Sequence, residues 1–238
     1  MSHEIKIHPA QTSILRELLF HPHAGYAVLQ KPTGLTSDHF NFHISRLVEI
    51  GYVTKESKGR YKLSANGKEY ANKLDTDNNT IERQPKIAVL LVIERVNPAG
   101  DKEYLFQQRL KQPWFGYWCF PTGKIRWGES IIETAERELF EETGLEATCT
   151  WLGLYHERPR LEGDADFSED KIFNIIHCTN PSRVLIEDFE GGHNEWLTYS
   201  QIIALPKKFQ SWELEFEFLE KRKNTLLEET PVYAKEEF

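Results

Sequence analysis

Three glutamates in the middle of the chain have a spacing that could bind a divalent metal ion. Glu138, Glu141 and Glu142 stand at positions i, i+3 and i+4, so on a helix their side chains share one face. Three like charges this close together repel one another unless cations neutralise them. Because crowded carboxylate oxygens suit Mg²⁺ and Mn²⁺, the spacing predicts a site for one of these ions.

The residues around these glutamates are typical of a helix. Ser130 and Glu133 have the spacing of a capping box, which indicates where the helix starts. Gly144 is well placed as the left-handed residue that ends it. An apolar stripe at helical spacing would face the core and consists of Ile132, Ala135 and Leu139. The acidic face is therefore expected to point toward a cleft that begins near Gly123.

The stretch from Gly123 to Leu145 reads GKIRWGESIIETAERELFEETGL. It resembles the Nudix box, G-x5-E-x7-R-E-U-x-E-E-x-G-U, where U is a bulky aliphatic residue, and every specified position is filled. The alternative, a solvated acidic helix, explains neither the two glycines nor the spacing. The resemblance implies an α/β fold of the Nudix type, an α/β/α sandwich. It also implies hydrolysis of a nucleoside diphosphate derivative with Mg²⁺ or Mn²⁺.

The resemblance further implies a role for each residue of the box. The residues expected to bind the metal are Gly123, Glu138, Glu141 and Glu142, and the three glutamates would also be catalytic. Glu129 and Arg137 would form an ion pair that fixes the loop against the helix. Family members often take a further glutamate from a loop beyond the box as ligand or general base. Glu190 is the candidate here. Glu169 and Asp170 are alternatives, and so is a merely solvated Glu190.

Aromatic residues gather just before the box and could stack on a nucleobase. They are Trp114, Phe115, Tyr117 and Trp118, and packing in the core is the alternative for each. Thr122 and Arg126 depart from the glycine and the acid that many family members carry at these positions. In the box loop, Arg126 and Trp127 are candidate substrate contacts. Pro159 lies 15 residues past Gly144, where a proline resembles the marker of the ADP-ribose-cleaving branch.

The first 75 residues have the pattern of a small helical domain with a hairpin. Helices are expected over 9–20, over 26–30 and from about 37, then strands at 52–54 and 61–63 and a closing helix. This order, together with the run SRLVEIGYVTKESKGRYKLSANGKEYANKL, resembles a winged helix-turn-helix domain of bacterial regulators.

That second resemblance implies that the third helix reads bases and that the basic turn contacts phosphates of DNA. The candidates on the helix are Asn41, Ser45 and Arg46, and those on the turn are Lys55, Lys58, Arg60 and Lys62. The alternative is a dimerisation or gating module that no longer binds DNA. His39 and His43 have the i, i+4 spacing of zinc ligands, although surface or packing histidines are the favoured interpretation.

Residues 76–84 are polar and are predicted to be a linker. The second domain would then span 85–238. Its strands are expected at 86–96, 103–109, 147–156, 171–178 and 195–197, with a last helix over 214–223.

Charge divides the chain unevenly. The formal net charge is -8, which argues against a generic nucleic-acid binder. Residues 1–75 carry 10 Lys and Arg against 7 Asp and Glu, a net of +3, so the remainder carries -11. Such asymmetry suggests two modules with different partners.

The 3 cysteines are isolated and form neither a disulfide framework nor a metal-spaced pair, which favours the reducing cytoplasm. No leader opens the sequence, and the longest apolar run, residues 87–93, is too short to span a membrane. Winged helices often pair, so a homodimer is expected.

Three functions are compatible with these observations. The first is a Mg²⁺-dependent diphosphatase acting on a nucleotide derivative such as ADP-ribose or a nucleoside triphosphate. The second is a DNA-binding regulator whose Nudix domain senses a nucleotide, a domain combination known in the family in the opposite order. The third is an enzyme that processes the 5′ end of RNA. Intact catalytic carboxylates favour turnover over sensing alone, so catalysis is ranked first.

Overall fold

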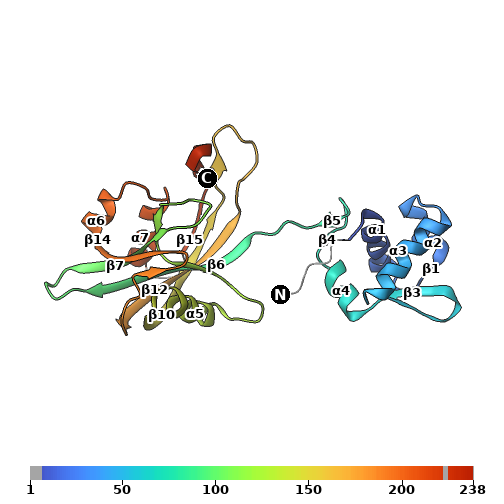
Figure 1. The fold of residues 1–238 in the computed structure, drawn as a ribbon, viewed down its shortest axis with the longest axis horizontal. Coiled ribbons are helices and arrows are strands. Elements are labelled where there is room, and N and C mark those ends of the chain that lie inside the picture. Colours follow the sequence, from blue (N-terminus) through green and yellow to red (C-terminus); the bar gives the residue numbers. More distant parts are fainter. Residues whose placement is uncertain (1–6, 222–224, 238) are drawn as a thin grey trace. The chain divides into compact units, whose positions relative to one another are not determined.

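A computed structural model describes residues 7–221 and 225–237 (Figure 1). The chain divides into two compact units, Met1–Arg83 and Gln84–Phe238. Each unit has its own hydrophobic core.

The first unit is built from short helices around a small sheet. Its helices are α1 (Pro9–Phe20), α2 (Tyr26–Gln30), α3 (Ser37–Glu49) and α4 (Ala65–Ala71), with 3-10 turns at η1 (Lys31–Thr33) and η2 (Ser57–Gly59). Its sheet has the order β1 (Ala24–Gly25), β3 (Arg60–Leu63), β2 (Val53–Lys55). His8 caps α1 through a capping box with Gln11, which explains why the helix begins at Pro9. The order of helices and hairpin is the one expected for a winged helix.

Most of the predicted linker, residues 76–84, belongs to the first unit, so this prediction is wrong for that part. Strands β4 (Leu74–Asp75) and β5 (Thr80–Ile81) form a hairpin that belongs to the first unit. The Arg16 Nε donates to the Thr76 carbonyl at 2.5 Å, and the Asn79 amide donates to the Ser13 hydroxyl at 2.8 Å. These hydrogen bonds attach polar residues whose sequence has no apolar pattern. The boundary between the two units therefore falls at residues 83–84 instead of 75–76.

The second unit is organised around one mixed sheet. The order of its main strands is β13-β14-β7-β6-β12-β10-β15, with β8 paired to β7 and β9 paired to β6. Their bounds are β6 Lys86–Val96, β7 Lys102–Arg109, β8 Trp118–Cys119, β9 Thr122–Lys124, β10 Glu146–Glu157, β12 Lys171–Ser182, β13 Asp188–Phe189, β14 Gly192–Thr198 and β15 Thr225–Glu229. Beside this sheet, β11 (Arg160–Leu161) pairs with β16 (Val232–Tyr233), and η3 (Lys235–Glu237) follows.

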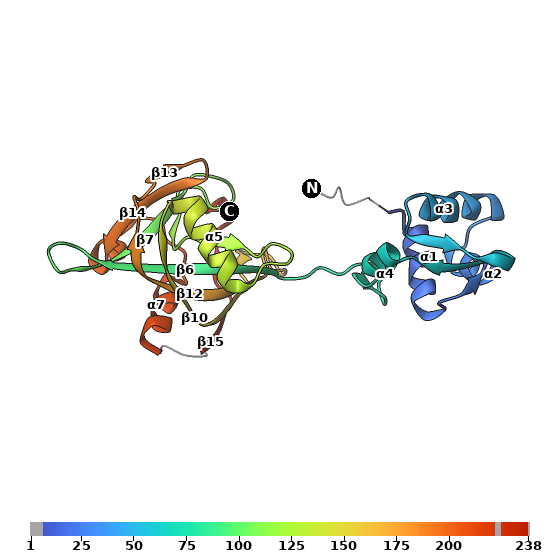
Figure 2. The ribbon, with the colours of Figure 1, turned by 90° about the horizontal axis from the view of Figure 1, so that it is seen from below.

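Helices cover both faces of this sheet, because β6 is apolar on both sides. Side chains on one face of β6 (Ala88, Leu90, Val92) share a core with Ile202 of α6 and Phe218 of α7. The alternate residues Val89, Leu91 and Ile93 pack against Ala135 and Leu139 of α5. Helix α5 spans Ile131–Thr143, α6 Tyr199–Ala204 and α7 Trp212–Lys221, and Figure 2 shows α5 lying across the sheet. The predicted α/β/α sandwich is confirmed.

Most expected elements are present, with bounds that shift by a few residues. The last helix ends at Lys221, and residues 222–223 of its predicted span lie outside the described residues. The short elements α6, β9 and β15 were not predicted from the sequence. In the part of the chain that the structure describes, no helix is both long and apolar enough to cross a membrane.

Candidate active site

The acidic helix α5 starts and ends where its sequence predicts. The Ser130 hydroxyl accepts from the Glu133 amide and the Glu133 carboxylate accepts from the Ser130 amide, which completes the capping box. Gly144 ends the helix in the left-handed conformation, with φ of 72°. The buried residues Ala135 and Leu139 fix the rotation of the helix. The opposite, acidic face is therefore left facing outward.

The three glutamates of α5 lie in different environments. Glu142 and Glu138 both line a cavity of about 460 Å³. The Glu142 carboxylate accepts from the Gln107 amide at 3.0 Å. Burial raises the pKa of Glu142, and the negative charge of Glu138 raises it further. Glu141 is more exposed and pairs with Arg126 at 2.9 Å.

Arg137 joins the box loop to the helix. Its guanidinium contacts both oxygens of Glu129, at 2.6 and 2.8 Å, so the predicted ion pair is present and bidentate. It also donates to Glu138 at 2.6 Å and to the Lys124 carbonyl at 3.1 Å. The hydrogen bond from Arg137 lowers the pKa of Glu129 to about 2. The arginine thus partly neutralises the acidic face while it holds the loop in place.

Gly123 lies where a side chain could not fit. It stands in β9, opposite Val89 of β6. A Cβ at this position would lie 2.0 Å from the Cγ and Cδ atoms of Glu138. The glycine therefore lets the Glu138 carboxylate lie against the backbone of the box loop.

The donors in this region are chemically suited to a hard divalent cation. Glu138, Glu142 and the backbone at Gly123 offer oxygen ligands, which fits Mg²⁺ or Mn²⁺. Among the described residues, no three acidic, histidine or cysteine side chains are already gathered closely enough to hold a metal. Arg137 contacts Oε1 of Glu138 and Oε2 of Glu141, so a cation could bind the other oxygen of Glu138 without breaking the contact with the arginine.

The cavity wall combines both signs of charge with aromatic rings. The charged and aromatic residues that line it are Lys86, Arg109, Lys111, Trp114, Lys124, Glu138, Glu142, Glu157, Glu169, Lys171, Phe173, Phe209 and Glu215. A site with acidic residues on one helix and several cations nearby is suited to a polyanion bound through a metal ion.

The predicted substrate-binding residues are separated by the fold. Of these predicted residues, Trp114 alone is among the described residues that line the cavity, and its side chain is almost fully buried. Trp118 packs inside the core. Phe115 is 54% exposed and Trp127 is 96% exposed. Arg126 pairs with Glu141 at the rim. Apart from Trp114, these side chains thus lie in the core or on the outer surface.

The predicted further glutamate, Glu190, is exposed in the turn before β14 and does not line the cavity. The alternative Glu169 does, and it is buried. Glu169 pairs with Lys86 at 2.9 Å and with Lys171. Burial would raise the pKa of Glu169, but the two lysines outweigh it and lower the pKa. The alternative Asp170 contacts His156 at 2.8 Å.

Several cavity residues had no signal in the sequence. Arg109 ends β7, and Glu157 ends β10. Ser211 directly precedes α7, and Glu215 lies in the first turns of that helix. A glutamate in an amphipathic helix is normally read as solvent-facing, so only the packing of α7 could reveal that Glu215 points inward.

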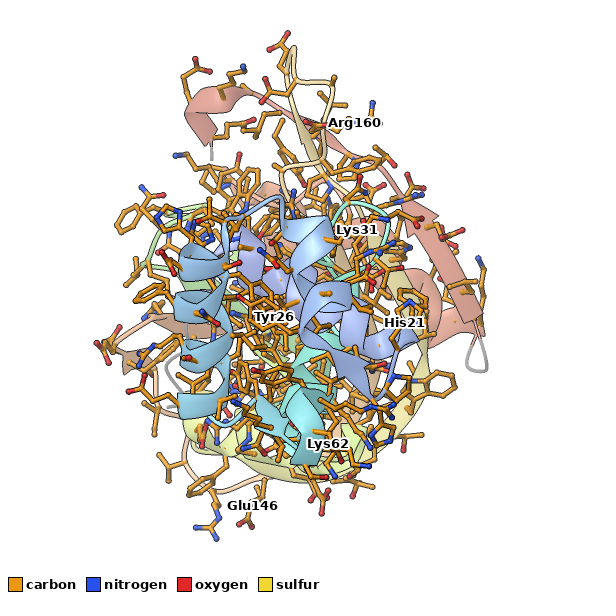
Figure 3. All side chains as sticks on the ribbon, turned by 90° about the vertical axis from the view of Figure 1, so that its right-hand side faces the viewer. His21, Tyr26, Lys31, Lys62, Glu146 and Arg160 are labelled. Carbon is orange, nitrogen blue, oxygen red and sulfur yellow. The ribbon has the colours of Figure 1, made fainter. Side chains whose placement is uncertain are left out.

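In the first unit, the predicted DNA contacts are on the surface. Asn41, Ser45 and Arg46 are exposed on α3, and Lys58 and Arg60 are exposed on the hairpin; Figure 3 labels Lys62 of the same hairpin. Glu49 pairs with Arg46 at 2.7 Å, and Glu56 pairs with Lys62 at 2.9 Å. These acidic partners reduce the positive charge of the surface.

The histidines considered as zinc ligands have another role. The rings of His8 and His43 stack with centroids 4.4 Å apart. Burial lowers the pKa of His43, and the nearby His8 and His39 lower it further. These contacts identify His43 as a packing residue.

Comparison with known proteins identifies the second unit. A family model described as the NUDIX domain matches residues 84–219. Over 105 residues the chain is 30% identical to an ADP-ribose pyrophosphatase of Methanocaldococcus jannaschii, covering 42% of this chain and 59% of that protein.

Two solved structures resemble the second unit. The Nudix domain of Shewanella oneidensis NrtR, crystallised with ADP ribose, matches with a TM-score of 0.51 at 19% identity, over 65% of this chain and 97% of that one. A mutator MutT protein from Bacillus halodurans matches with a TM-score of 0.47 at 22% identity, over 64% and 93%. Since the NUDIX domain model spans more than half of the sequence, and the box, the sandwich and the cavity agree with it, the chain belongs to the Nudix family.

Proposed function

We propose that this protein is a divalent-metal-dependent diphosphatase that cleaves a nucleoside diphosphate derivative, with ADP-ribose as the first substrate to test. The observation that supports this most directly is that Glu138 and Glu142 line one cavity, with Glu138 lying against the glycine that opens the box. The curated relative is an ADP-ribose pyrophosphatase, of whose length the chain spans 59%. The solved Nudix domain of similar fold is bound to ADP ribose.

The residues in and around the cavity would have different roles in such a reaction. Glu138, Glu142 and the backbone at Gly123 would hold the cation, with Glu141 joining when its contact with Arg126 opens. When bound, the ion would neutralise phosphate charge and make water more acidic. Arg109, Lys111 and Lys124 line the same cavity and would bind phosphate oxygens.

Gln107 and Arg137 position the acidic residues. Gln107 donates to Glu142, and Arg137 fixes Glu138 and the box loop. Because both contacts constrain side-chain rotation, they would keep the carboxylates near the scissile diphosphate. Glu138 and Glu142 line the cavity, whereas Glu141 and Glu190 are exposed, so the first two are the better candidates for contact with the substrate.

The test is release of AMP from ADP-ribose by the purified chain, with Mg²⁺ and with a chelator. We expect activity only with the metal. Glu142→Gln should reduce kcat by about 100-fold or more. The matched control is Glu136→Gln, an exposed glutamate of the same helix, which should retain the full rate. Full activity in the Glu142 variant would overturn the assignment. Nucleoside triphosphates and 5′-triphosphate RNA complete the substrate panel.

The second candidate is DNA binding by the first unit. It is supported by exposed polar residues on α3 beside an exposed basic hairpin. A triple change of Lys55, Lys58 and Arg60 to Ala should abolish a mobility shift on DNA from the protein's own upstream region. Lys68→Ala, an exposed lysine of α4, is the control. A wild-type shift that does not weaken with salt, or no shift at all, would count against this candidate.

We also propose that the protein is a cytoplasmic homodimer. Its three cysteines are free thiols, which fits a reducing compartment. Light scattering coupled to size exclusion would measure the mass in solution, and a monomer of 27.9 kDa would contradict the dimer.

A further inference from the structure

The inner end of the cavity holds two carboxyl groups joined by a serine. Glu157, the last residue of β10, and Glu215 of α7 are each only 4% exposed. The Ser211 hydroxyl lies 3.3 Å from Oε1 of both glutamates. All three residues line the cavity. The other oxygen of Glu215, Oε2, is buried without a hydrogen-bond partner among residues 7–221 and 225–237.

The number of hydrogen atoms on these three side chains limits which hydrogen bonds they can form with one another. A serine hydroxyl has one hydrogen, so it can donate to one carboxylate only. The second contact is a hydrogen bond only if the other carboxyl group carries a proton and donates to the serine oxygen. A neutral carboxyl group is thus part of the arrangement.

Glu215 is the group that carries the proton. Burial raises the pKa of Glu157 as well, but the positive charge of Lys171 and the Tyr155 hydroxyl, which donates to Glu157 at 3.4 Å, both favour its charged form. Glu215 has no cation among the causes of its pKa shift. Burial and, after it, the charge of Glu157 raise the pKa of Glu215 to about 8. When Oε1 of Glu215 carries this proton and donates to Ser211, Oε2 remains an acceptor without a donor among the described residues.

Aromatic rings contribute to the wall of the cavity that contains this acceptor. Rings of Trp114, Phe173 and Phe209 line the same cavity. Burial raises the pKa of the Cys119 thiol to about 12, with smaller contributions from Glu215 and Glu142. Cys119, Glu142 and Glu215 line the same cavity, which places the acceptor and the acidic helix within reach of one small molecule.

We propose that Glu215, positioned by Ser211 and Glu157, binds a hydrogen-bond donor on the nucleobase of the substrate. An exocyclic amino group or a ring N–H would satisfy Oε2, while the aromatic walls would contact the faces of the ring. An anionic group is disfavoured there by the charge of Glu157. This inference rests on the proposed function, because it takes a nucleotide derivative as the ligand.

The test measures binding of nucleoside monophosphates to the full chain by calorimetry. AMP and GMP carry amino groups, whereas purine riboside 5′-monophosphate has neither an amino group nor a ring N–H to donate. The wild type should bind at least one of AMP and GMP about 10-fold or more tightly than purine riboside monophosphate. Equal binding of all three, or no binding of any, would overturn the proposal.

Two variants separate hydrogen bonding from packing. In Glu215→Gln, the amide nitrogen can donate to Ser211 and the amide oxygen can accept from the base, so the preference should remain. In Glu215→Leu the acceptor is gone, so the preference should fall to about 1-fold. Glu213→Gln, an exposed position of the same helix, is the control. Thermal denaturation shows whether the leucine variant is folded. A folded leucine variant that keeps the wild-type preference would refute the role of Glu215.

The pH dependence of the base preference is a further test, because a purely structural role of Glu215 would not make this preference depend on pH. The groups near Glu215 that titrate or carry charge are Glu157, Tyr155, Cys119, Tyr233 and Lys171. Of these, Tyr155, Cys119 and Tyr233 have pKa values raised by burial. Wild-type preference should therefore change above about pH 8 as Glu215 loses its proton and becomes a charged acceptor, while the Glu215→Gln profile stays flat. A wild-type profile as flat as that of the variant would contradict the protonated state.

Failure of the proposed function can be distinguished from failure of the inference about Glu215. Without hydrolysis of any substrate in the panel, the diphosphatase assignment fails even if the base preference is measured. With hydrolysis intact but no base preference, only the inference about Glu215 fails.

Discussion

The acidic residues of the second unit differ in function because their neighbours differ. Glu141 and Glu142 are adjacent in sequence, yet Glu141 pairs with Arg126 at the rim and Glu142 accepts from Gln107 inside the cavity. Glu138 lies against Gly123, with no space for a larger residue between them. Small changes at these positions should therefore alter activity more than stability.

Gly123→Ala is the sharpest change of this kind. A Cβ only 2.0 Å from Glu138 atoms must displace that carboxylate or the loop, and a misplacement of about 1 Å can cost 100-fold in rate. We expect kcat/KM for ADP-ribose to fall by about 100-fold while circular dichroism is unchanged. The control is Gly25→Ala, where the added Cβ would meet nothing within 4 Å. Wild-type activity in the Gly123 variant would show that this close approach is unimportant.

At the level of elements, the box works because a loop and a helix are fastened to each other. Arg137 on α5 contacts Glu129, Glu138 and the Lys124 carbonyl. The capping box at Ser130 then fixes where α5 begins. Since β9 is hydrogen-bonded to β6, the loop, the helix and the sheet are connected at the metal-binding residues.

Breaking this connection should give a pH-dependent loss of stability. The pKa of Glu129 is lowered by Arg137 from 4.5 to about 2. Its stabilising effect is therefore fully present above about pH 4.5 and disappears as the pH falls toward 2. We expect Arg137→Gln to lower the urea midpoint at pH 6 and to lower it less at pH 3. Arg183→Gln removes the exposed pair with Glu146 and is the control with a smaller expected effect. An equal decrease of the urea midpoint at pH 6 and at pH 3 would contradict the role of the Glu129–Arg137 pair.

At the level of the whole molecule, the two units differ in charge and in chemistry. The first carries an exposed basic hairpin, and the second carries the buried carboxylates and the cavity. All 6 tryptophans lie in the second unit, so their fluorescence reports the unfolding of that unit separately. This allows its stability to be measured in the intact chain.

The buried Glu215 should make the second unit less stable as pH rises. Its pKa is about 8 in the folded state against an ordinary value of 4.5, so the folded chain binds one more proton between these values. The free energy of unfolding should then fall by roughly 1 kcal/mol per pH unit from about pH 5 to 8. Glu215→Gln should reduce this slope, measured by urea denaturation with tryptophan fluorescence. Parallel curves for wild type and variant would refute it.

Features that depend on short-range spacing could be predicted from the residues alone. The acidic helix, its cap and its terminating glycine follow from residues within one turn, and the apolar strands follow from local patterns. The Glu129–Arg137 pair and the α/β/α arrangement were implied by the resemblance to the Nudix box, and the structure contains both. Local hydrogen bonding and periodic burial are encoded by neighbouring residues, which explains why they can be read from the sequence.

Which distant residues share the cavity follows from the folded arrangement and has no signal in the sequence. It brought Glu169 to the wall and left Glu190 on the surface, and it buried Trp118 while exposing Trp127. It also joined Glu157 to Glu215 through Ser211, across separate elements. Whether a carboxylate is a solvated charge or a buried acid depends on the packing around it, and that packing is set by residues far away in the sequence.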